Sequence, residues 1–447
     1  QLKKWCGNFI DLLRQRVMKK VINPGDKELK RAMQRPQLEQ KDLSDTVSTI
    51  FSHIEKEGDK AVNEYALKFD GVTLDSLLVS TNEVNQAKEQ VSHELKSAIL
   101  RAAENITAFH ESQKEPVKKV ETFPGVFCWR KSVGIDKVGL YIPGGTAPLF
   151  STVLMLGIPA KIAKCKEIVL CTPTNSKGEI NPAILYAADL VGITKIFKVG
   201  GIQAIAAMCI GTESIPEVYK IFGPGNQYVT AAKQYAQQLG KAIDMPAGPS
   251  EVMVVADNNA NPAFIAADLL SQAEHGADSQ VVFVTNEEQM LDQVAFEVEK
   301  QLSALPRKDL AAQSLECAKL ICVGENKILE LINEYAPEHL ILNTTFNDML
   351  LEGVTNAGSI FIGQYTPESL GDYASGTNHT LPTNGFAKMY SGVSLDSFVK
   401  KITYQSASAT GLQKLGPVVE IMAGAEQLDA HKNAVSIRLK ALENEKE

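Results

Sequence analysis

The sequence predicts an α/β protein with two Rossmann-like, doubly wound parallel-sheet domains and small helical segments at its N- and C-terminal ends. From residue 134 onward, short β-branched and aliphatic runs alternate with helix-like segments, and several runs end in Gly or Pro turns. Parallel strands need helical crossovers, which cover both faces of the sheet. The expected strands are 138–142, 168–172, 196–199, 218–222, 252–256, 281–285, 340–342 and 360–362.

The region before residue 134 has helical apolar spacing, most clearly over 44–69 and 91–109. Three histidines, His53, His93 and His110, lie beside these apolar stripes or at the end of one. They have no second metal-binding or proton-transferring group close by. We therefore expect them to be solvated surface side chains.

The pattern of expected helices and strands along the chain predicts one arm and three domains. Residues 1–22 read as a basic amphipathic helical arm. Residues 23–140 and 250–393 are expected to form a discontinuous α/β domain that carries most metal and catalytic groups. Residues 141–249 are expected to form a second, Rossmann-like domain, and residues 394–447 a small helical domain.

Composition excludes several classes of protein. A hydrophobic content of 44% and 22% charged residues are ordinary for a globular chain of 447 residues. The net charge of −8 argues against nucleic acid or an anionic membrane as partner. Apolar runs stay below the ~18 residues that span a bilayer. The seven cysteines form no CxxC pair, which favours reduced thiols and a cytoplasmic location.

Three Gly-rich turns follow expected strands and precede helical patterns, at 143–146, 200–203 and 223–226. Parallel sheets bind ligands at the carboxyl ends of strands, and backbone N–H groups at a helix start can bind phosphate. The turns lack the GxGxxG pattern, since Tyr228 stands where the third glycine is expected. Taken alone, they leave open either a nucleotide site or tight βα turns without a ligand.

A possible metal site is spread over several segments. Gln272 and His275 have i, i+3 spacing, which places them on one helix face. Asp372 and His379 share a polar loop, and His431 opens a late helical stretch. Imidazole nitrogens with carboxylate and amide oxygens suit zinc, with manganese or cobalt as alternatives. The spacing matches no structural zinc finger, so a catalytic or substrate-holding metal is favoured over a folding site; each residue alone can also be an ordinary surface polar group.

Glu338 and His339 follow Pro337 at a loop or helix start. Neighbouring side chains of this kind can border one cleft and serve different proton transfers, each contributing roughly 10²–10⁴ in rate. A Glu-His pair by itself is common, so its weight depends on the other groups.

These groups together make the chain similar to the histidinol dehydrogenase family over most of its length. The most specific segments are YIPGG at 141–145, GPGN at 223–226, AGPSE at 247–251, QAEH at 272–275, APEH at 336–339 and GDYASGTNH at 371–379. The resemblance implies a four-electron oxidation of L-histidinol, through L-histidinal, to L-histidine with two NAD⁺ in turn.

The resemblance also implies roles for single residues. Gln272, His275, Asp372 and His431 would bind one zinc ion per subunit, which would hold the imidazole and amino nitrogens of the substrate. His339 would take the alcohol proton and Glu338 would activate water. The substrate-contacting positions would be Ser250, Gln272, His275, His339, Asp372, His379, Glu426 and His431. NAD would contact Tyr141, Gln203 and Asn226.

Aldehyde oxidation by hydride transfer first needs a tetrahedral adduct, formed by water or by a thiol. Cys165 and Cys171 lie in or beside an expected strand, without a histidine beside them in sequence. Neither has the surroundings of an activated thiolate. Water with Glu338 is therefore the preferred hypothesis.

The resemblance further implies an intertwined homodimer, in which Glu426 and His431 reach the site of the partner chain. Two other functions compete with this one. A zinc-dependent amide hydrolase would use the same metal, carboxylate and imidazole, but the chain lacks HExxH and carries three Gly-rich βα turns. A catalytically inactive metal- or nucleotide-binding protein would require loss of Glu338 or His339, and both are present.

Overall fold

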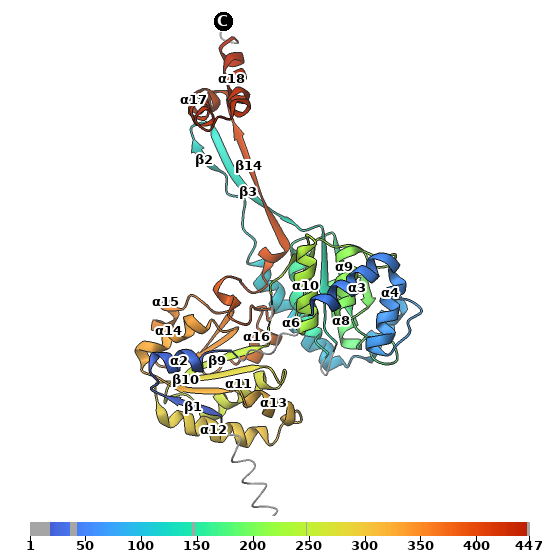
Figure 1. Ribbon diagram of the computed structural model, residues 1–447, viewed down its shortest axis with the longest axis vertical. Coiled ribbons are helices and arrows are strands. Elements are labelled where there is room, and N and C mark those ends of the chain that lie inside the picture. Colours follow the sequence, from blue (N-terminus) through green and yellow to red (C-terminus); the bar gives the residue numbers. More distant parts are fainter. Residues whose placement is uncertain (1–17, 36–42, 145–147, 247, 445–447) are drawn as a thin grey trace, which may run out of the picture.

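The computed structural model describes residues 18–35, 43–144, 148–246 and 248–444. Two α/β domains lie side by side, and an arm that ends in two helices projects from them (Figure 1). We name the domains by their sheets, which have six and five strands. All neighbouring strands within these two sheets are parallel, as the sequence predicts.

The six-stranded sheet has the order β1-β11-β10-β9-β12-β13, so the strand order reverses between β9 and β12. Its strands are β1 (Lys19–Ile22), β9 (Glu251–Ala256), β10 (Gln280–Thr285), β11 (Lys319–Cys322), β12 (His339–Asn343) and β13 (Ser359–Ile362). Every residue of β9 is buried. Val252 and Val254 face one apolar core, and Met253 and Val255 face the other. The two-residue period of a strand thus supplies both faces of a covered sheet.

Helices cover both faces of this sheet. One face packs against α11 (Pro262–Ala273), α12 (Glu288–Leu302) and α13 (Lys308–Leu315). The opposite face packs against α2 (Asp26–Ala32), α14 (Glu325–Tyr335) and α15 (Asn347–Gly353). A short helix, α16 (Glu368–Tyr373), lies against α11.

The five-stranded sheet has the order β6-β5-β4-β7-β8 and reverses between β4 and β7. Its strands are β4 (Lys137–Tyr141), β5 (Glu167–Thr172), β6 (Lys195–Lys198), β7 (Lys220–Phe222) and β8 (Ala242–Ile243). One face packs against α5 (Thr81–Gln90), α6 (His93–Glu111), α7 (Phe150–Ile162) and α8 (Pro182–Val191). The other packs against α3 (Ser44–Glu57), α4 (Asp59–Tyr65) with the π-helix η1 (Ala66–Asp70), α9 (Gly201–Ile210) and α10 (Gln227–Gln238).

The expected domain division is wrong for most of the first 140 residues. Val47, Ile50 and Phe51 of α3 belong to the same core as Phe197 and Ile205, so α3 covers the five-stranded sheet. Helix α6 packs on the other face of that sheet. An apolar stripe shows that a helix has a buried face, but it does not show which sheet covers that face. In the described part of 23–43, α2 does join the six-stranded domain.

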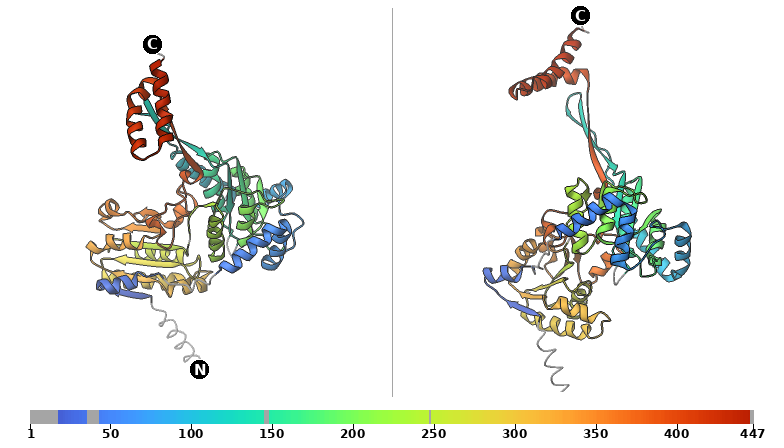
Figure 2. Two further views of the ribbon diagram at one scale, coloured as in Figure 1. Left: turned by 45° about the horizontal axis from the view of Figure 1, so that its top comes forward. Right: turned by 45° about the vertical axis from the view of Figure 1, so that its right-hand side comes forward.

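The arm contains strands that the sequence analysis missed. Strand β14 (Val399–Ala407) follows a 3-10 turn, η3 (Leu395–Phe398), and pairs antiparallel with β3 (Val126–Gly134). Strand β2 (Val120–Phe123) completes this ribbon, and α17 (Ala409–Ala425) and α18 (Asp429–Asn444) end it (Figure 2). The expectation of an all-helical 394–447 is therefore wrong for β14, whose exposed, polar sequence has no clear alternation.

At the other end, the expected helix over 1–22 is wrong for Lys19–Ile22, which form the edge strand β1. Residues 1–17 lie outside the described residues. Each of the eight strands expected from the sequence falls on an observed strand, with boundaries within two residues. In the part of the chain that the structure describes, no helix is both long and apolar enough to cross a membrane.

The three isolated histidines differ from one another. His93 is exposed, as expected, and His53 is partly buried, with Nδ1 3.1 Å from the hydroxyl of Tyr65. The expectation is wrong for His110, which is fully buried. Its Nδ1–H donates to the carbonyl of Ile106 at 2.9 Å, and burial lowers its pKa. A backbone acceptor one helical turn away therefore makes burial of this ring possible.

The base of the arm is fixed by Phe398, which is fully buried and stacks on Phe222 with ring centroids 4.0 Å apart. We expect Phe398→Ala to lower the free energy of unfolding by about 3–5 kcal/mol, because it leaves a cavity in the core. Urea denaturation of the full chain measures this. The matched control is Phe296→Ala, since Phe296 is 65% exposed; equal losses in both variants would contradict the anchoring role.

Candidate active site

A cavity of about 100 Å³ lies between the two domains. The five-stranded domain lines it with the turn that contains Gly223 and Gly225, and with Lys233 and Asp244. The facing side chains are Ser250, Glu338, His379, Thr380, Leu381 and Thr383. A larger surface hollow of about 420 Å³ beside α12 has no histidine or cysteine in its lining, so cavity size does not mark the site here.

The two sheets present opposite ends of their strands to the cavity. Tyr141 is the last residue of β4 and Gly223 follows β7, so the five-stranded sheet presents its carboxyl ends at the strand-order reversal. Glu251 and His339, by contrast, are the first residues of β9 and β12. The carboxyl-end rule thus holds for one sheet, while the acid-base groups lie at the amino ends of the other.

Glu338 and His339 are both buried and lie where α14 gives way to β12. Ala336 ends the helix with φ of 52°, a left-handed conformation that turns the chain directly into the strand. The Glu338 carboxylate accepts a hydrogen bond from the backbone N–H of Glu251 at 2.8 Å. His339 Nδ1 lies 3.1 Å from the Glu251 carbonyl, which can only accept, so Nδ1 carries a proton and Nε2 remains for the site.

His339 is surrounded by carboxylates. Its Nε2 lies 3.3 Å from Asp372 Oδ1, and its Nδ1 lies 3.6 Å from Glu338 and 3.7 Å from Glu368. Burial alone lowers the pKa of His339, but the charges of Glu368, Glu338 and Asp372 outweigh it and raise the pKa well above the ordinary value. The neighbouring imidazoles in turn lower the pKa of Asp372 despite its burial. These opposite shifts indicate a site organised around charge.

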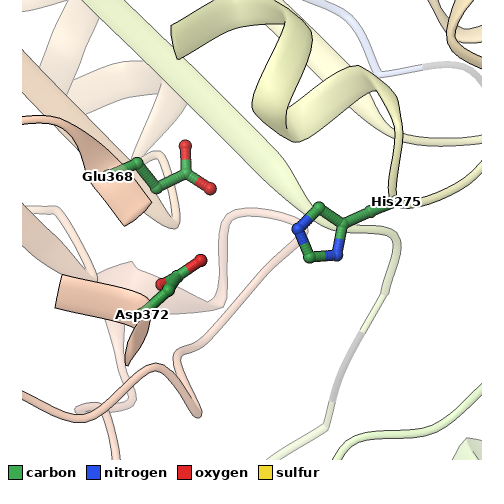
Figure 3. Close-up of side chains that lie close together, drawn as sticks. All are labelled: His275, Glu368 and Asp372. Atoms are coloured by element: carbon green, nitrogen blue, oxygen red, sulfur yellow. The ribbon is translucent and has the colours of Figure 1, made fainter. Parts of the chain in front are cut away.

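Three groups converge as a possible metal site: His275, Glu368 and Asp372 offer ligand atoms within 4.8 Å of one another. Figure 3 shows both carboxylates facing the imidazole. Gln272 lies one helical turn before His275 and is buried. With its amide oriented to satisfy both groups, Gln272 donates its N–H to Glu368. The structure therefore brings together the expected residues Gln272, His275 and Asp372.

Glu368 is the member of this site that the sequence analysis missed. It is almost fully buried in α16 and lies one turn before Asp372, so the i, i+4 spacing was the available signal. Burial and the nearby Asp372 and Glu338 raise the pKa of Glu368 well above its ordinary range. So much carboxylate in a buried space is compatible with a divalent cation. The nitrogen and oxygen donors suit zinc, and they also admit manganese or cobalt.

Two expected site residues lie elsewhere. His431 is on α18 and Glu426 ends α17, and both side chains are exposed. These helices form the tip of the arm, far from both sheets (Figure 1). Within one chain the structure does not bring His431 or Glu426 to the other site residues.

His379 and Ser250 both line the cavity. His379 Nδ1 donates to the carbonyl of Asp372 at 2.9 Å, so its Nε2, 3.1 Å from Thr152 Oγ1, accepts from that hydroxyl. Burial lowers the pKa of His379. His379 is therefore an oriented imidazole whose neutral form is favoured by burial, whereas the carboxylates around His339 favour the charged form of that ring.

The expected NAD contacts lie at the carboxyl ends of the five-stranded sheet. The Tyr141 hydroxyl accepts from Gly201 N at 3.1 Å, and burial raises the pKa of Tyr141 to about 12. Gln203 is buried in the first turn of α9. Asn226 caps α10 by accepting from the N–H groups of Tyr228 and Val229. Residues 145 and 146 of the first Gly-rich turn, and residue 247 of the AGPSE segment, lie outside the described residues.

The Gly223 turn is held in place by hydrogen bonds to two buried charged side chains. Gly223 has φ of 134° and passes so close to the carbonyl of Tyr141 that a Cβ would clash. Its N–H donates to Asp244 at 2.8 Å, and its carbonyl accepts from Lys233 at 3.0 Å. Lys233 and Asp244 also form a buried ion pair with each other. The turn is thus held rigidly with its open side toward the cavity.

The thiols of Cys165 and Cys171 lie in surroundings that favour the protonated form. Burial raises the pKa of Cys165 to about 12 and that of Cys171 still further. Both therefore remain protonated near neutral pH, which confirms that neither is an activated thiolate.

Comparison with known proteins decides the family. The family model described as histidinol dehydrogenase matches residues 33–439.

The chain belongs to the histidinol dehydrogenase family.

Among the curated relatives, the histidinol dehydrogenase of Bacteroides thetaiotaomicron is 60% identical over 427 residues, which are 95% of this chain and 100% of that protein. The histidinol dehydrogenase of Escherichia coli O157:H7 is 50% identical over 423 residues, 94% of this chain and 96% of that protein. The crystal structure of histidinol dehydrogenase from Elizabethkingia anophelis aligns with a TM-score of 0.94 at 57% identity, covering 95% of this chain and 99% of that one.

Membership of the histidinol dehydrogenase family makes this chain an oxidoreductase of histidine biosynthesis. It confirms the family expected from the six sequence segments. The amide hydrolase alternative finds no support in these comparisons.

Asp268, near the carboxylate cluster, should make the stability of the protein depend on pH. Burial raises the pKa of Asp268 from 3.8 to about 7, so the folded state holds a proton that the unfolded state has lost. Stability from this group therefore falls as pH rises from about 4 to 7 and is constant above that. Asp268→Asn should remove up to about 4 kcal/mol of destabilisation at pH 8.

The measurement is the melting temperature of chelator-treated protein at pH 5 and pH 8. The variant should gain more at pH 8 than at pH 5. Asp75→Asn, a change at an exposed carboxylate, is the control. A gain in Asp268→Asn that is equal at both pH values would contradict the assignment.

Proposed function

We propose that this chain oxidises L-histidinol through L-histidinal to L-histidine with two molecules of NAD⁺, using His339 and Glu338 as separate proton acceptors. The observation that carries the proposal is the shared anchoring of these two side chains on the peptide groups of Glu251, at the cavity between the domains. Glu338 lines the cavity together with the Gly223 turn, and His339 follows Glu338 in the chain, so two proton acceptors lie at or next to this cavity.

In the first oxidation, His339 accepts the hydroxyl proton while hydride leaves the alcohol carbon for the nicotinamide of NAD⁺. The Glu251 carbonyl fixes the tautomer, so Nε2 is the accepting atom. The imidazole can accept a proton only when the charge of Glu368 and Asp372 is offset, because these carboxylates raise its pKa. Tyr141, Gln203 and Asn226 would contact NAD from the five-stranded domain.

In the second oxidation, water adds to the aldehyde carbon and Glu338 accepts its proton. Hydride then leaves the resulting hydrate for a second NAD⁺, which gives the carboxylate product. The Glu338 carboxylate is held by the N–H of Glu251, so it is oriented before water arrives. Ser250 and His379 line the same cavity and would contact the substrate.

The residues that would hold one zinc ion per subunit are Gln272, His275 and Asp372 from one chain and His431 from a second chain. When bound, zinc supplies a Lewis acid that orients the substrate's nitrogens. Glu368 would take the Gln272 amide N–H and leave the amide oxygen to the metal.

A homodimer would supply the missing groups. Helices α17 and α18 expose Ile421 (73%), Met422 (59%) and Ile437 (53%) at the arm tip. Apolar side chains at the end of a projecting arm fit a surface that a second copy covers. Because His431 and Glu426 lie on these helices, the same contact would deliver them to the partner's cavity.

The full reaction yields a defined product count. Complete oxidation of L-histidinol should form two NADH per molecule, and treatment with a chelator should abolish turnover until zinc is restored. Absorbance of NADH and a metal assay on the same sample measure both. One NADH per substrate would contradict the role of Glu338, and turnover by verified metal-free protein would contradict the zinc site.

If each active site contains residues from both chains of the dimer, two inactive variants should complement each other. Glu338→Gln and His431→Ala should each be inactive, but their co-expressed mixture should recover about a quarter of the unaltered activity. Half of the dimers are then mixed, and each mixed dimer contains one site with neither change. The activity of the purified co-expressed mixture measures this, and a different tag on each chain verifies that mixed dimers have formed. A mixture as inactive as its parents would show that each chain uses its own arm.

A further inference from the structure

We propose that Arg35 and Glu251 form a positioning pair that sets the geometry of both catalytic side chains. The inference rests on the proposed roles of Glu338 and His339. Arg35 follows α2 near the N-terminus, whereas Glu251 begins β9. Neither residue was singled out for chemistry from the sequence.

The peptide groups of Glu251 hold both acid-base side chains. Its N–H donates to Glu338 at 2.8 Å, and its carbonyl accepts from His339 at 3.1 Å. A shift of this residue along its strand would therefore move Glu338 and His339 together. Misplacement by about 1 Å can cost roughly 10²-fold in rate.

The side chain of Glu251 is fixed in turn by Arg35. The guanidinium donates from Nε to one carboxylate oxygen at 2.6 Å and from a terminal nitrogen to the other at 2.8 Å. This fork fixes direction as well as distance. The backbone N–H of Asn384 also donates to the carboxylate, at 3.1 Å. The Glu251 side chain is completely buried, so three donors replace water around it.

Arg35 also holds the other side of the catalytic pair. The same terminal nitrogen donates to the carbonyl of Tyr335 at 2.8 Å, and the guanidinium lies 4.0 Å from the centre of the Tyr335 ring. Tyr335 is the last residue of α14, and Ala336 then turns the chain toward Glu338. One guanidinium therefore joins the strand that anchors the two catalytic side chains to the turn that carries them.

A buried ion pair is weak evidence for a stabilising role, because desolvation offsets much of its attraction. Replacing both charges by neutral groups is therefore the informative change, since it leaves no unpaired buried charge. A pair that serves only folding would lose activity in proportion to folded protein. A positioning pair would lose kcat in protein that is fully folded.

The test compares Arg35→Met/Glu251→Gln and the single variant Arg35→Lys with the unaltered enzyme. Arg35→Lys keeps the charge and removes the fork, so it remains informative if the double variant fails to fold. Both variants should keep the melting temperature within a few degrees and the KM for NAD⁺. Their kcat should fall roughly 10–100-fold with L-histidinol and with L-histidinal, and the pH profile of kcat/KM should shift.

The matched control is Asp257→Asn at the opposite end of β9. Asp257 is also a buried carboxylate, but it accepts from the backbone and hydroxyl of Thr345, away from the cavity. Its kcat and pH profile should stay unchanged. Folded variants of Arg35 and Glu251 with unaltered kcat and pH profile would overturn the positioning role alone. Failure of the unaltered enzyme to oxidise L-histidinol would instead overturn the proposed function.

Discussion

The site depends on packing several carboxylates into a space that excludes most water. Glu251, Glu338, Glu368 and Asp372 are all buried or partly buried. An ionised carboxylate in such surroundings is costly unless donors or cations replace its water. Arg35, backbone N–H groups and imidazole rings replace water around these carboxylates. Glu368 and Asp372 beside His275 form the metal site proposed above.

This constraint explains why the residues come from distant parts of the chain. The two strand-order reversals bring β4 beside β7 in one sheet and β9 beside β12 in the other. The reversal in the five-stranded sheet opens at the carboxyl ends of its strands beside the cavity, whereas the six-stranded sheet presents the amino ends of β9 and β12 there. The Gly223 turn needs close backbone approach to Tyr141, so it lies where β4 and β7 end side by side. The carboxylates need many donors, so they lie where strand starts expose free N–H groups.

Local patterns in the sequence predicted the strands well, because buried parallel strands are continuous apolar runs. The same patterns and family segments indicated Gln272, His275, Glu338, His339 and Asp372 as candidates, and the structure brings these side chains into one cluster. Patterns of this kind do not report which sheet a helix covers, and so α3 and α6 were assigned to the wrong domain. Glu368 has only its i, i+4 spacing from Asp372 as a local signal. Arg35 and Glu251 pair across 216 residues, so their local sequence contains little trace of the contact.

The edge strand β1 has a consequence for synthesis of the chain. Lys19–Ile22 pair with Lys319–Cys322, which are 300 residues further along. At ~5–20 residues per second, a ribosome needs about 15–60 s to make the intervening chain. During that time β1 has no sheet to join, and exposed strand edges invite association with other chains. The edge of β1 must therefore be shielded, by a chaperone or by the collapsed nascent chain, until β11 has been synthesised and can pair with it.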